Sequence, residues 1–592
     1  MNSSVDGRRF SALCLSVSLS VFLILQPIAA VAAPVKATES APANDRNVRQ
    51  VLNRLTFGAR PGDFEAVRAI GFKAFIDQQL SPDNIDDSAL EKRLEKLPTL
   101  MLSNPTIAEL YNPPKPKPTP TPTPNPAASP AKTALVADAK PVETIMNRDK
   151  PAVADVPKPS PTPAAKPMPT PVPKNPYQVV TQLQQAKLLR AVYSERQLYE
   201  VMVDFWENHF SIYANKDSDR LLLTSFDRDS IRPYAFGRFR DLLGATAKSP
   251  AMLYYLDNWN SSALRKYPAT KDKPARQTGG VNENYARELM ELHTLGVDGG
   301  YTQKDVQEVA RCFTGWTIRK PNEEGIFFYN PAMHDNGEKT VMGVKIPAGG
   351  GIGDGERVLD ILAKSPATAR FISTKLARRF LGDDPPASAV DRAAKVFLAT
   401  DGSISAMLKS IVTSPEFFST ANYQSKIKSP FEFVASALRA TGAETDAAQP
   451  ILGWITRMGQ PVYGRVTPDG YPDTAREWLS NNDLLTRFNF ASAFAMNNIK
   501  GTTIDAAKLL SNESDPERAA NETIRVVLMG QVSDKTRKSL EKLALDTSKT
   551  GAAAVPGAAA MVPASLKPND KTKAVSSQLI ALALGTPEFQ RK

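Results

Sequence analysis

Cysteine and histidine are almost absent from this chain. Its 592 residues include 2 cysteines and 3 histidines. Cys14 lies in an apolar run near the N-terminus, and Cys312 is the only cysteine after it. Once that run is removed, no intrachain disulfide can form, and stability has to come from packing.

Short sequence motifs typical of catalytic and cofactor-binding sites are missing as well. The sequence has no HExxH zinc motif, no GxSxG nucleophile elbow, no Walker loop and no CxxCH haem motif. No run of lysine and arginine interleaved with aromatic residues marks a nucleic-acid groove. The net charge of +11 is no evidence for one either, because the segment 112–176 alone holds 9 basic and 4 acidic residues. We therefore expect no nucleic-acid partner.

The N-terminus has the layout of a cleavable secretory signal. Two arginines precede an apolar run over 10–28, which ends in a stretch of small residues. We predict a signal peptide over 1–32, cut near Ala32, followed by a flexible segment over 33–46. The alternative is a retained helical anchor, because the run is nearly long enough to span a membrane. Cleavage would leave no stable transmembrane segment and an exported protein, periplasmic or extracellular.

Two segments interrupt the globular pattern. The segment 112–176 is built around KPKPTPTPTPNP and KPSPTPAAKPMPTPVP, and the segment 547–572 is rich in alanine, proline and lysine. Such compositions cannot bury enough apolar surface to become ordered. We interpret both as disordered insertions within one large domain over 47–592.

Outside these insertions the pattern is mainly helical. A serine or threonine before a proline supplies an N-cap and a suitable first helical residue. Such pairs occur at 249–250, 365–366, 414–415, 429–430 and 586–587. Two strand candidates, 326–329 and 340–346, flank the turn signal Asn336-Gly337. We predict a mainly α fold, with a large multi-helix domain, a small β-hairpin and a long disordered proline-rich insertion.

Characteristic blocks recur along nearly the whole chain. In order they are LNRLTFGARPGD from Leu52, FWENHF from Phe205, SPAMLYYLDN from Ser249, NENYARELMELHTLG from Asn282, FTGW from Phe313, NPAMHDNGEKTVMG from Asn330, KIKSPFEFVASALRA from Lys426, MGQPVYGRVTPDGYPD from Met458 and GTPEFQR from Gly585. The series resembles the bacterial exported family catalogued as domain of unknown function 1800. The resemblance implies no particular reaction, because that family has no established activity.

The segment 281–317 carries an unusual polar stripe. A helix is predicted over 282–296, and a second helix is predicted to begin at Thr302, with Asp305 placed to complete its cap. One arc of the first helix, at 100° per residue, carries Asn284, Arg287, Glu288 and Glu291. This arc is either a solvated face with ion pairs along the helix or a buried functional cluster in which the arginine compensates the carboxylates.

The histidines are the other candidates for chemistry. His209 shares an apolar arc with Trp206, so we predict that it points inward. Its role is either that of a hydrogen-bonded core residue or that of a ligand or acid–base group. His293 points away from the two glutamates of the stripe and is interpreted as structural.

Two short polar pairs complete the candidates. His334 and Asp335 lie on an irregular loop, where they could face a pocket or satisfy the loop's own backbone, with Lys339 pairing with Asp335 in either case. Asp257 and Asn258 follow a predicted helix and could be binding residues or only a C-terminal cap.

We predict that the candidate catalytic residues converge in one site, formed by His209, Glu288, Glu291, His334 and Asp335. These residue types suit zinc or another divalent metal, although the sequence does not identify a cofactor. Without a metal, the carboxylates could divide acid and base roles. Candidate binding residues are Asn284, Arg287, Asp257, Asn258 and Lys339.

Two functions remain open. The first, slightly favoured because no nucleophile motif is present, is a non-catalytic binding or accessory protein of the cell envelope. Its partner would be another exported protein or an extracellular polymer. The second is a hydrolase acting on an extracytoplasmic substrate through the carboxylate and histidine site. The oligomeric state is left open.

Overall fold

The computed structural model describes residues 43–112, 175–271, 274–550 and 568–592. The described part is mainly helical, with only small two-stranded sheets, which confirms the predicted fold class. The predicted signal peptide and most of the proline-rich insertion lie outside the described residues. Within the described residues, no helix is both long and apolar enough to cross a membrane.

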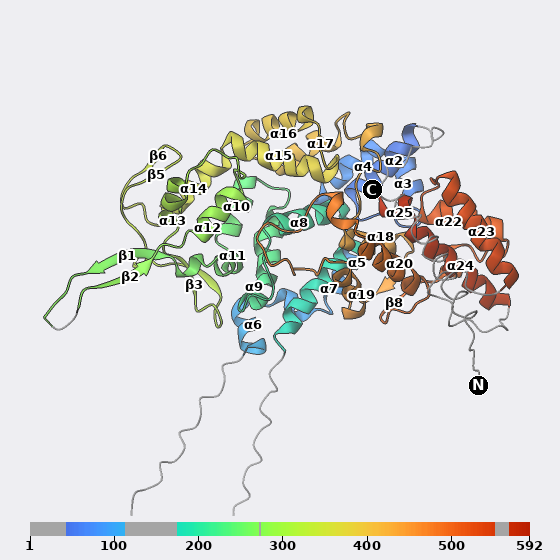
Figure 1. The fold of residues 1–592 in the computed structure, drawn as a ribbon, viewed down its shortest axis with the longest axis horizontal. Helices are drawn as coiled ribbons and strands as arrows, with labels where there is room; N and C mark the ends of the chain where they lie inside the picture. The colour runs from blue at the N-terminus through green and yellow to red at the C-terminus, as the bar shows by residue number, and fades with distance from the viewer. Residues whose placement is uncertain (1–42, 113–174, 272–273, 551–567) are drawn as a thin grey trace, which may run out of the picture.

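The first part of the chain supplies two groups of helices (Figure 1). The N-terminal group consists of α2 (Ala43–Leu55), α3 (Asp63–Ile70), α4 (Phe72–Gln79), α5 (Ser88–Leu94) and α6 (Asn104–Tyr111), with short 3-10 turns at Pro82–Asn84 and Pro98–Met101. The central group consists of α7 (Tyr177–Tyr193), α8 (Gln197–His209), α9 (Asp219–Ser225), a π-turn (Phe226–Ile231) and a 3-10 turn (Arg232–Tyr234). The predicted apolar face of α8 is buried at Leu198, Met202, Phe205 and Trp206.

A second block carries most of the strands. Its helices are α10 (Phe239–Ala247), α11 (Pro250–Tyr255), α12 (Asn284–Glu291), α13 (Gln303–Cys312) and α14 (Ile352–Ala363), with a 3-10 turn at Asn258–Asn260. Its strands are β1 (Ser262–Tyr267), β2 (Arg276–Gly280), β3 (Trp316–Arg319), β4 (Ile326–Tyr329), β5 (Lys339–Val341) and β6 (Val344–Ile346). The β1–β2 hairpin extends away from the body of the molecule (Figure 1).

The remaining helices connect this block to the C-terminal region. They are α15 (Pro366–Phe380), α16 (Ala387–Ala399), α17 (Ile404–Val412), α18 (Pro430–Ala440), α19 (Gln449–Arg457), α20 (Asn481–Ala495), α21 (Ala506–Leu509), α22 (Pro516–Val527), α23 (Asp534–Thr550), α24 (Pro568–Gly585) and α25 (Pro587–Gln590), with 3-10 turns at Thr420–Asn422 and Ala475–Trp478. Strands β7 (Glu444–Thr445) and β8 (Thr502–Thr503) pair with each other as a short antiparallel sheet. The ends of the predicted 547–572 insertion are therefore helical, and 551–567 lies outside the described residues.

The hairpin prediction was wrong in its pairing. Strand β4 pairs with β3 rather than with the strand at 340–346, and that stretch itself forms a separate hairpin, β5–β6. The turn between β5 and β6 is Met342-Gly343, whose φ angles are 48° and 80°. Two consecutive positive φ angles suit the tight turn of a two-residue hairpin, and methionine gives no sequence signal for that conformation.

Most of the predicted helix starts were correct. Ser365, Ser429 and Thr586 cap α15, α18 and α25 through their side chains, and Thr302 with Asp305 forms the predicted capping box. No helix starts at 415, and α12 is shorter than predicted. It ends early because the next backbone amides bond five residues back, as His293 N does to Glu288 O.

Both ends of the described chain are tied to its middle. In α2, Gln50 donates to the Phe417 carbonyl and Arg54 to the Asn422 carbonyl. At the other end, the Lys592 amide donates to the Lys426 carbonyl. One continuous apolar core holds these parts together and runs from α2 to α25.

Candidate functional site

The polar stripe of α12 lies at the surface. Arg287 has 40% of its side chain exposed, and it pairs with Glu283 at 3.3 Å and with Gln303 at 3.0 Å. The Asn284 amide reaches the Leu256 carbonyl at 3.4 Å. The stripe is thus a half-exposed face with local pairing. Of the two alternatives that the sequence left open, the structure shows the solvated face with ion pairs.

The two glutamates of the stripe do not share one partner. Burial, reinforced by Glu291, raises the pKa of Glu288. Glu291 itself contacts the Tyr301 hydroxyl at 3.4 Å. Within the described part of the chain, neither carboxylate forms a hydrogen bond or ion pair with a histidine side chain.

His209 points inward, as predicted. Its Nε2 lies 3.1 Å from the His293 carbonyl, and aromatic rings of Phe205, Trp206 and Phe210 surround it. Burial, with Lys375 second, holds the pKa of His209 well below its usual value. The ring is therefore neutral, donates to the carbonyl, and belongs to an aromatic core.

The 334–335 loop forms a separate cluster. His334 lies 2.8 Å from the Thr314 carbonyl through Nδ1 and 3.1 Å from Asp354 through Nε2. Lys339 donates to the same Asp354 carboxylate at 2.5 Å and to the backbone carbonyl of Asp335. The Asp335 carboxylate pairs with Arg311 instead, at 2.9 Å, so the predicted side-chain pair of Asp335 with Lys339 does not form.

Asp257 and Asn258 act at the end of α11. Asp257 adopts a left-handed φ of 59° and pairs with Lys216 at 2.8 Å. The buried Asn258 amide bonds the carbonyls of Phe313 and Trp316. Both roles are structural, so the candidate residues occupy separate surroundings instead of one site. The described ranges contain no group of three or more histidine, cysteine or acidic side chains arranged to hold a metal ion.

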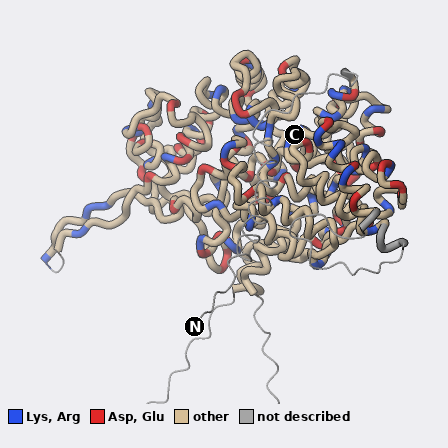
Figure 2. The backbone as a smooth tube through the Cα atoms, turned by 45° about the vertical axis from the view of Figure 1, so that its right-hand side comes forward, with Lys and Arg blue, Asp and Glu red and all other residues tan. Residues whose placement is uncertain are grey.

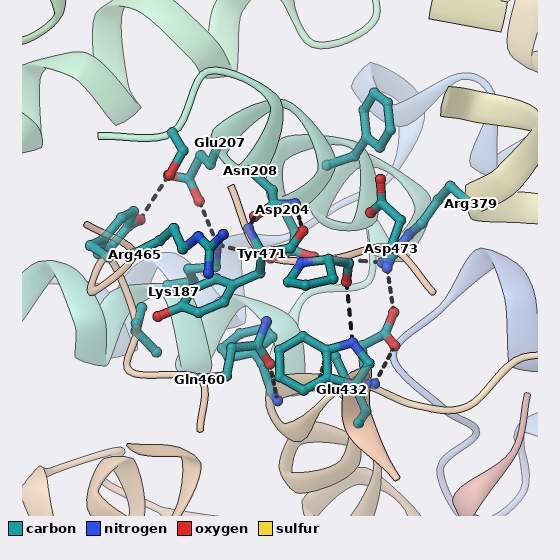
Figure 3. A pocket seen from close by; sticks show the side chains of 18 of the residues that line it. Lys187, Asp204, Glu207, Asn208, Arg379, Glu432, Gln460, Arg465, Tyr471 and Asp473 are labelled. Atoms are coloured by element: carbon teal, nitrogen blue, oxygen red, sulfur yellow. Dashed lines mark hydrogen bonds and ion pairs between the residues drawn. The ribbon is translucent and has the colours of Figure 1, made fainter. Parts of the chain in front are cut away.

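A pocket that the sequence reading did not single out opens elsewhere, between α7, α8, α15, α18 and the loop 458–480 (Figure 3). Its empty space of about 900 Å³ includes the open solvent at its mouth. Its cations are Lys187, Arg379, Lys426, Arg465 and Lys592, and its carboxylates are Asp204, Glu207, Glu432 and Asp473. Aromatic rings complete the wall, at Phe205, Phe431, Tyr463, Tyr471 and Trp478.

One ionic cluster of the pocket joins α7 to α8. Lys187 lies 2.8 Å from Asp204 and 2.7 Å from Glu207. The Tyr463 hydroxyl donates to Glu207 at 2.7 Å. Behind this cluster, Arg232 binds Asp227 at 2.9 Å and Glu200 at 2.8 Å.

A second cluster is centred on Glu432, in the first turn of α18. Arg379 of α15 binds it at 2.5 Å, Lys592 contacts the same carboxylate, and the Ser429 amide donates to it at 3.0 Å. Arg379 also lies 3.6 Å from Asp204, which links the two clusters. Charge-assisted hydrogen bonds of this kind are strong in a buried setting, so the pocket walls are held in fixed positions.

The pKa values of the two pocket glutamates, Glu207 and Glu432, are shifted in opposite directions. Burial, opposed by Lys187 and reinforced by Asp227, raises the pKa of Glu207 to about 7. Although burial acts in the same sense on Glu432, Arg379 and Lys592 reverse it and hold the pKa of Glu432 well below its usual value. Near neutral pH, one carboxyl can exchange a proton while the other stays ionised.

The loop 458–480 closes one side of the pocket and is pinned to α8. The Asn208 side chain bonds both the amide and the carbonyl of Tyr471. Gly470 has a φ of 75°, and a Cβ there would lie 2.2 Å from the Asn208 carbonyl oxygen. Long ordered loops of this kind are usually functional.

Gly470→Ala is expected to destabilise the protein by about 2 kcal/mol or more, because a left-handed φ and a backbone clash act together. The matched control is Gly459→Ala in the same loop, with a φ of 91° and nothing within 4 Å of its added Cβ. Urea unfolding should show a cost of about 1 kcal/mol for the control. Equal losses in the two variants would contradict the close approach to α8.

Glu207 should also make stability depend on pH. Its folded-state pKa, about 7, is raised from 4.5, so the folded protein binds this proton more tightly than the unfolded chain does. The contribution of Glu207 therefore falls as pH rises through this window. The free energy of unfolding of the wild type minus that of Glu207→Gln should decrease by up to about 3 kcal/mol between pH ~5 and ~8. A difference that stays constant with pH would show that this carboxyl is not perturbed.

The sequence contained one signal for this site. Glu200, Asp204 and Glu207 recur at positions i, i+4 and i+7, which places three carboxylates on one face of an otherwise apolar helix. The FWENHF block includes Glu207. The informative residue of that block is thus the carboxylate two residues before its histidine.

Comparison with known proteins places the chain in a family. The family described as "Protein of unknown function (DUF1800)" matches residues 50–591. The chain belongs to this family. Several of the DUF1800 blocks contribute directly to the pocket, among them FWENHF, KIKSPFEFVASALRA and MGQPVYGRVTPDGYPD. No curated protein and no solved structure matches the chain.

Proposed function

We propose that this DUF1800 protein is an exported cell-envelope protein that binds a polar, hydroxyl-rich ligand, such as a neutral carbohydrate segment, in the pocket of α7, α8, α15 and α18. The observation that carries the proposal is the composition of the wall. Charges of both signs, five cations and four carboxylates, stand beside flat aromatic rings. Nearly balanced charge disfavours a strongly ionic ligand, whereas hydroxyl groups can both donate to the carboxylates and accept from the cations.

The aromatic residues support the same class of ligand. Tyr471 and Trp478 are neighbours, with ring centroids 6.1 Å apart, and the Tyr471 hydroxyl is already bonded to the Pro461 carbonyl. Both rings line the pocket, Trp478 with only 6% of its surface exposed. Such rings offer apolar contact to the C–H faces of a sugar ring. Rigid walls also reduce the entropy lost on binding.

Export rests on the N-terminal sequence. Arg8 and Arg9, the apolar run and the small residues before Ala33 favour a cleaved signal. N-terminal sequencing of the protein recovered from fractionated cells should find a start close to residue 33, outside the cytoplasm. Recovery of the intact N-terminus in the cytoplasm would overturn the export proposal.

The binding test uses a panel of soluble neutral and N-acetylated oligosaccharides, measured by calorimetry. We expect binding that is weakened about tenfold or more by Trp478→Ala, because an aromatic contact surface is lost. Trp454→Ala is the matched control, since Trp454 of α19 packs against Phe490 of α20 and does not line the pocket. Equal weakening by both variants, or no binding by the panel, would contradict the proposal.

A hydrolase is the second candidate, and one observation favours it. The opposite pKa shifts of Glu207 and Glu432 are those of a proton donor and an ionised partner in one pocket. Glu207 would protonate the leaving group, and Glu432 would stabilise developing positive charge. Release of reducing ends from the same panel, lost in Glu207→Gln while binding is retained, would establish this activity. Binding without turnover would leave the non-catalytic function.

A further inference from the structure

We propose that a second, smaller cavity binds a small organic monocarboxylate, independently of the pocket described above. It lies between α2, α18, α22 and α25, which gather at one end of the molecule (Figure 1). Its empty space of about 430 Å³ includes the open solvent at its mouth. Its wall draws on the LNRLTFGARPGD, KIKSPFEFVASALRA and GTPEFQR blocks, and the first and last of these do not reach the pocket of Figure 3.

Arg49 of α2 brings to this cavity donors that the fold does not use. It is only 7% exposed, and its Nε donates to the Met529 carbonyl at 2.8 Å. Within the described part of the chain, its Nη1 and Nη2 form no hydrogen bond or ion pair, and Nη1 is buried. Burial lowers the pKa of Arg49, which a bound carboxylate would counteract. The planar fork of a guanidinium matches the two oxygens of such a group.

Two side-chain amides add neutral donors. Asn53 follows Arg49 by four residues in α2, so the two side chains are neighbours on one face of the helix. Asn53 and Gln424 both line the cavity and are 6% and 9% exposed. Among the described residues, neither side chain has a hydrogen-bond partner. Buried amides are usually hydrogen-bonded, so a ligand with acceptor oxygens would satisfy them.

Lys428 places a second cation at the cavity. Its Nζ donates to the Ser436 hydroxyl at 2.8 Å and lies 4.1 Å from the centroid of the Phe589 ring. It is 5% exposed and forms no ion pair in the ranges that the structure describes. Burial, opposed by Glu432, lowers the pKa of Lys428 to about 7. A bound anion would favour the protonated amine.

The rest of the wall limits the charge of the ligand. Figure 2 shows acidic residues interspersed with lysine and arginine throughout the body of the molecule, so two cations without a carboxylate partner are a local feature. Glu588 is the one acidic residue among the described lining residues, and Ser533 and Thr536 already donate to its carboxylate. Two cations and one carboxylate favour a singly charged anion over phosphate. The apolar side chains of 526–529 suit a short carbon chain.

The test measures binding of acetate, propionate, lactate and pyruvate to the full-length protein by calorimetry, with inorganic phosphate and sulfate as comparison anions. Lys428→Gln removes the charge and can still donate to Ser436, and Arg49→Lys keeps the charge but loses the planar fork. The matched controls are Lys409→Gln and Arg93→Lys, which change exposed cations paired with Asp77 and Glu444.

We expect at least one monocarboxylate to bind, with affinity that falls about tenfold in each cavity variant and less than about twofold in each control. Asn53→Ala removes no hydrogen bond of the described fold, so it should fold even if the cation variants do not, and it should weaken binding about threefold or more.

Three results would overturn the proposal: no binding of any monocarboxylate by the wild type, equal losses in the cavity variants and their controls, or tighter binding of phosphate than of every monocarboxylate. Trp478→Ala should bind the monocarboxylate as the wild type does, because Trp478 lines the other pocket. Failure of this test therefore leaves the oligosaccharide test unaffected.

Discussion

Glu432→Ala is expected to destabilise the protein by about 3–5 kcal/mol, because it leaves one buried and one largely buried cation without their carboxylate. Arg379 and Lys592 both depend on this group, and Ser429 loses one half of its capping box. Burial, with Arg379 second, already lowers the pKa of Lys592 to about 7. Without Glu432, which raises it, the pKa of the Lys592 amine should fall below this value.

Urea unfolding at fixed pH measures this cost. The control is Glu444→Ala, which breaks the exposed pair with Arg93, where 66% of the glutamate side chain is accessible. Its loss should stay below about 1 kcal/mol. If both variants lose the same small amount, the cluster around Glu432 does not hold α15 and α18 together.

Lys187→Met should cost a similar amount, about 3–5 kcal/mol at pH ~8, because the buried Glu207 and the partly buried Asp204 are left as neighbouring carboxylates without their cation. The methionine keeps most of the side-chain volume, so the loss measures charge rather than a cavity. Adding Glu207→Gln removes one of the two negative charges and should recover a large part of the stability. Additive losses in this double-mutant cycle would mean that the two residues are not coupled.

Local features of the fold were predictable from the sequence. Ser365, Ser429 and Thr302 cap helices where expected, since a cap depends on residues within one turn. The inward direction of His209 followed from periodicity alone. The pairing of the strands could not be predicted from the sequence. The turn that joins β5 to β6 contains Met342, and methionine gives no sequence signal for the left-handed conformation that it adopts there.

The site was harder to predict for a physical reason. Lys187, Glu432 and Lys592 are far apart in sequence and meet only through the packing of α7, α15 and α18, which no local periodicity encodes. The stripe of α12 was ambiguous in the sequence for a related reason. Arg287 looked suited to a buried cluster, yet helices α12 and α13 satisfy it at the surface through Glu283 and Gln303.

The attachment of both chain ends to the middle has a consequence for folding kinetics. Gln50 bonds Phe417 and Arg49 bonds the Met529 carbonyl, and the strand-like end of the chain pairs Arg591 with Ile427. Contacts of such long sequence separation form slowly, because large loops must close before the contacts stabilise them. The segment around 417–428 cannot reach its final packing until residues 587–592 have been synthesised. The packing of α2 and of the segment around 417–428 is therefore a late event in the folding of this chain.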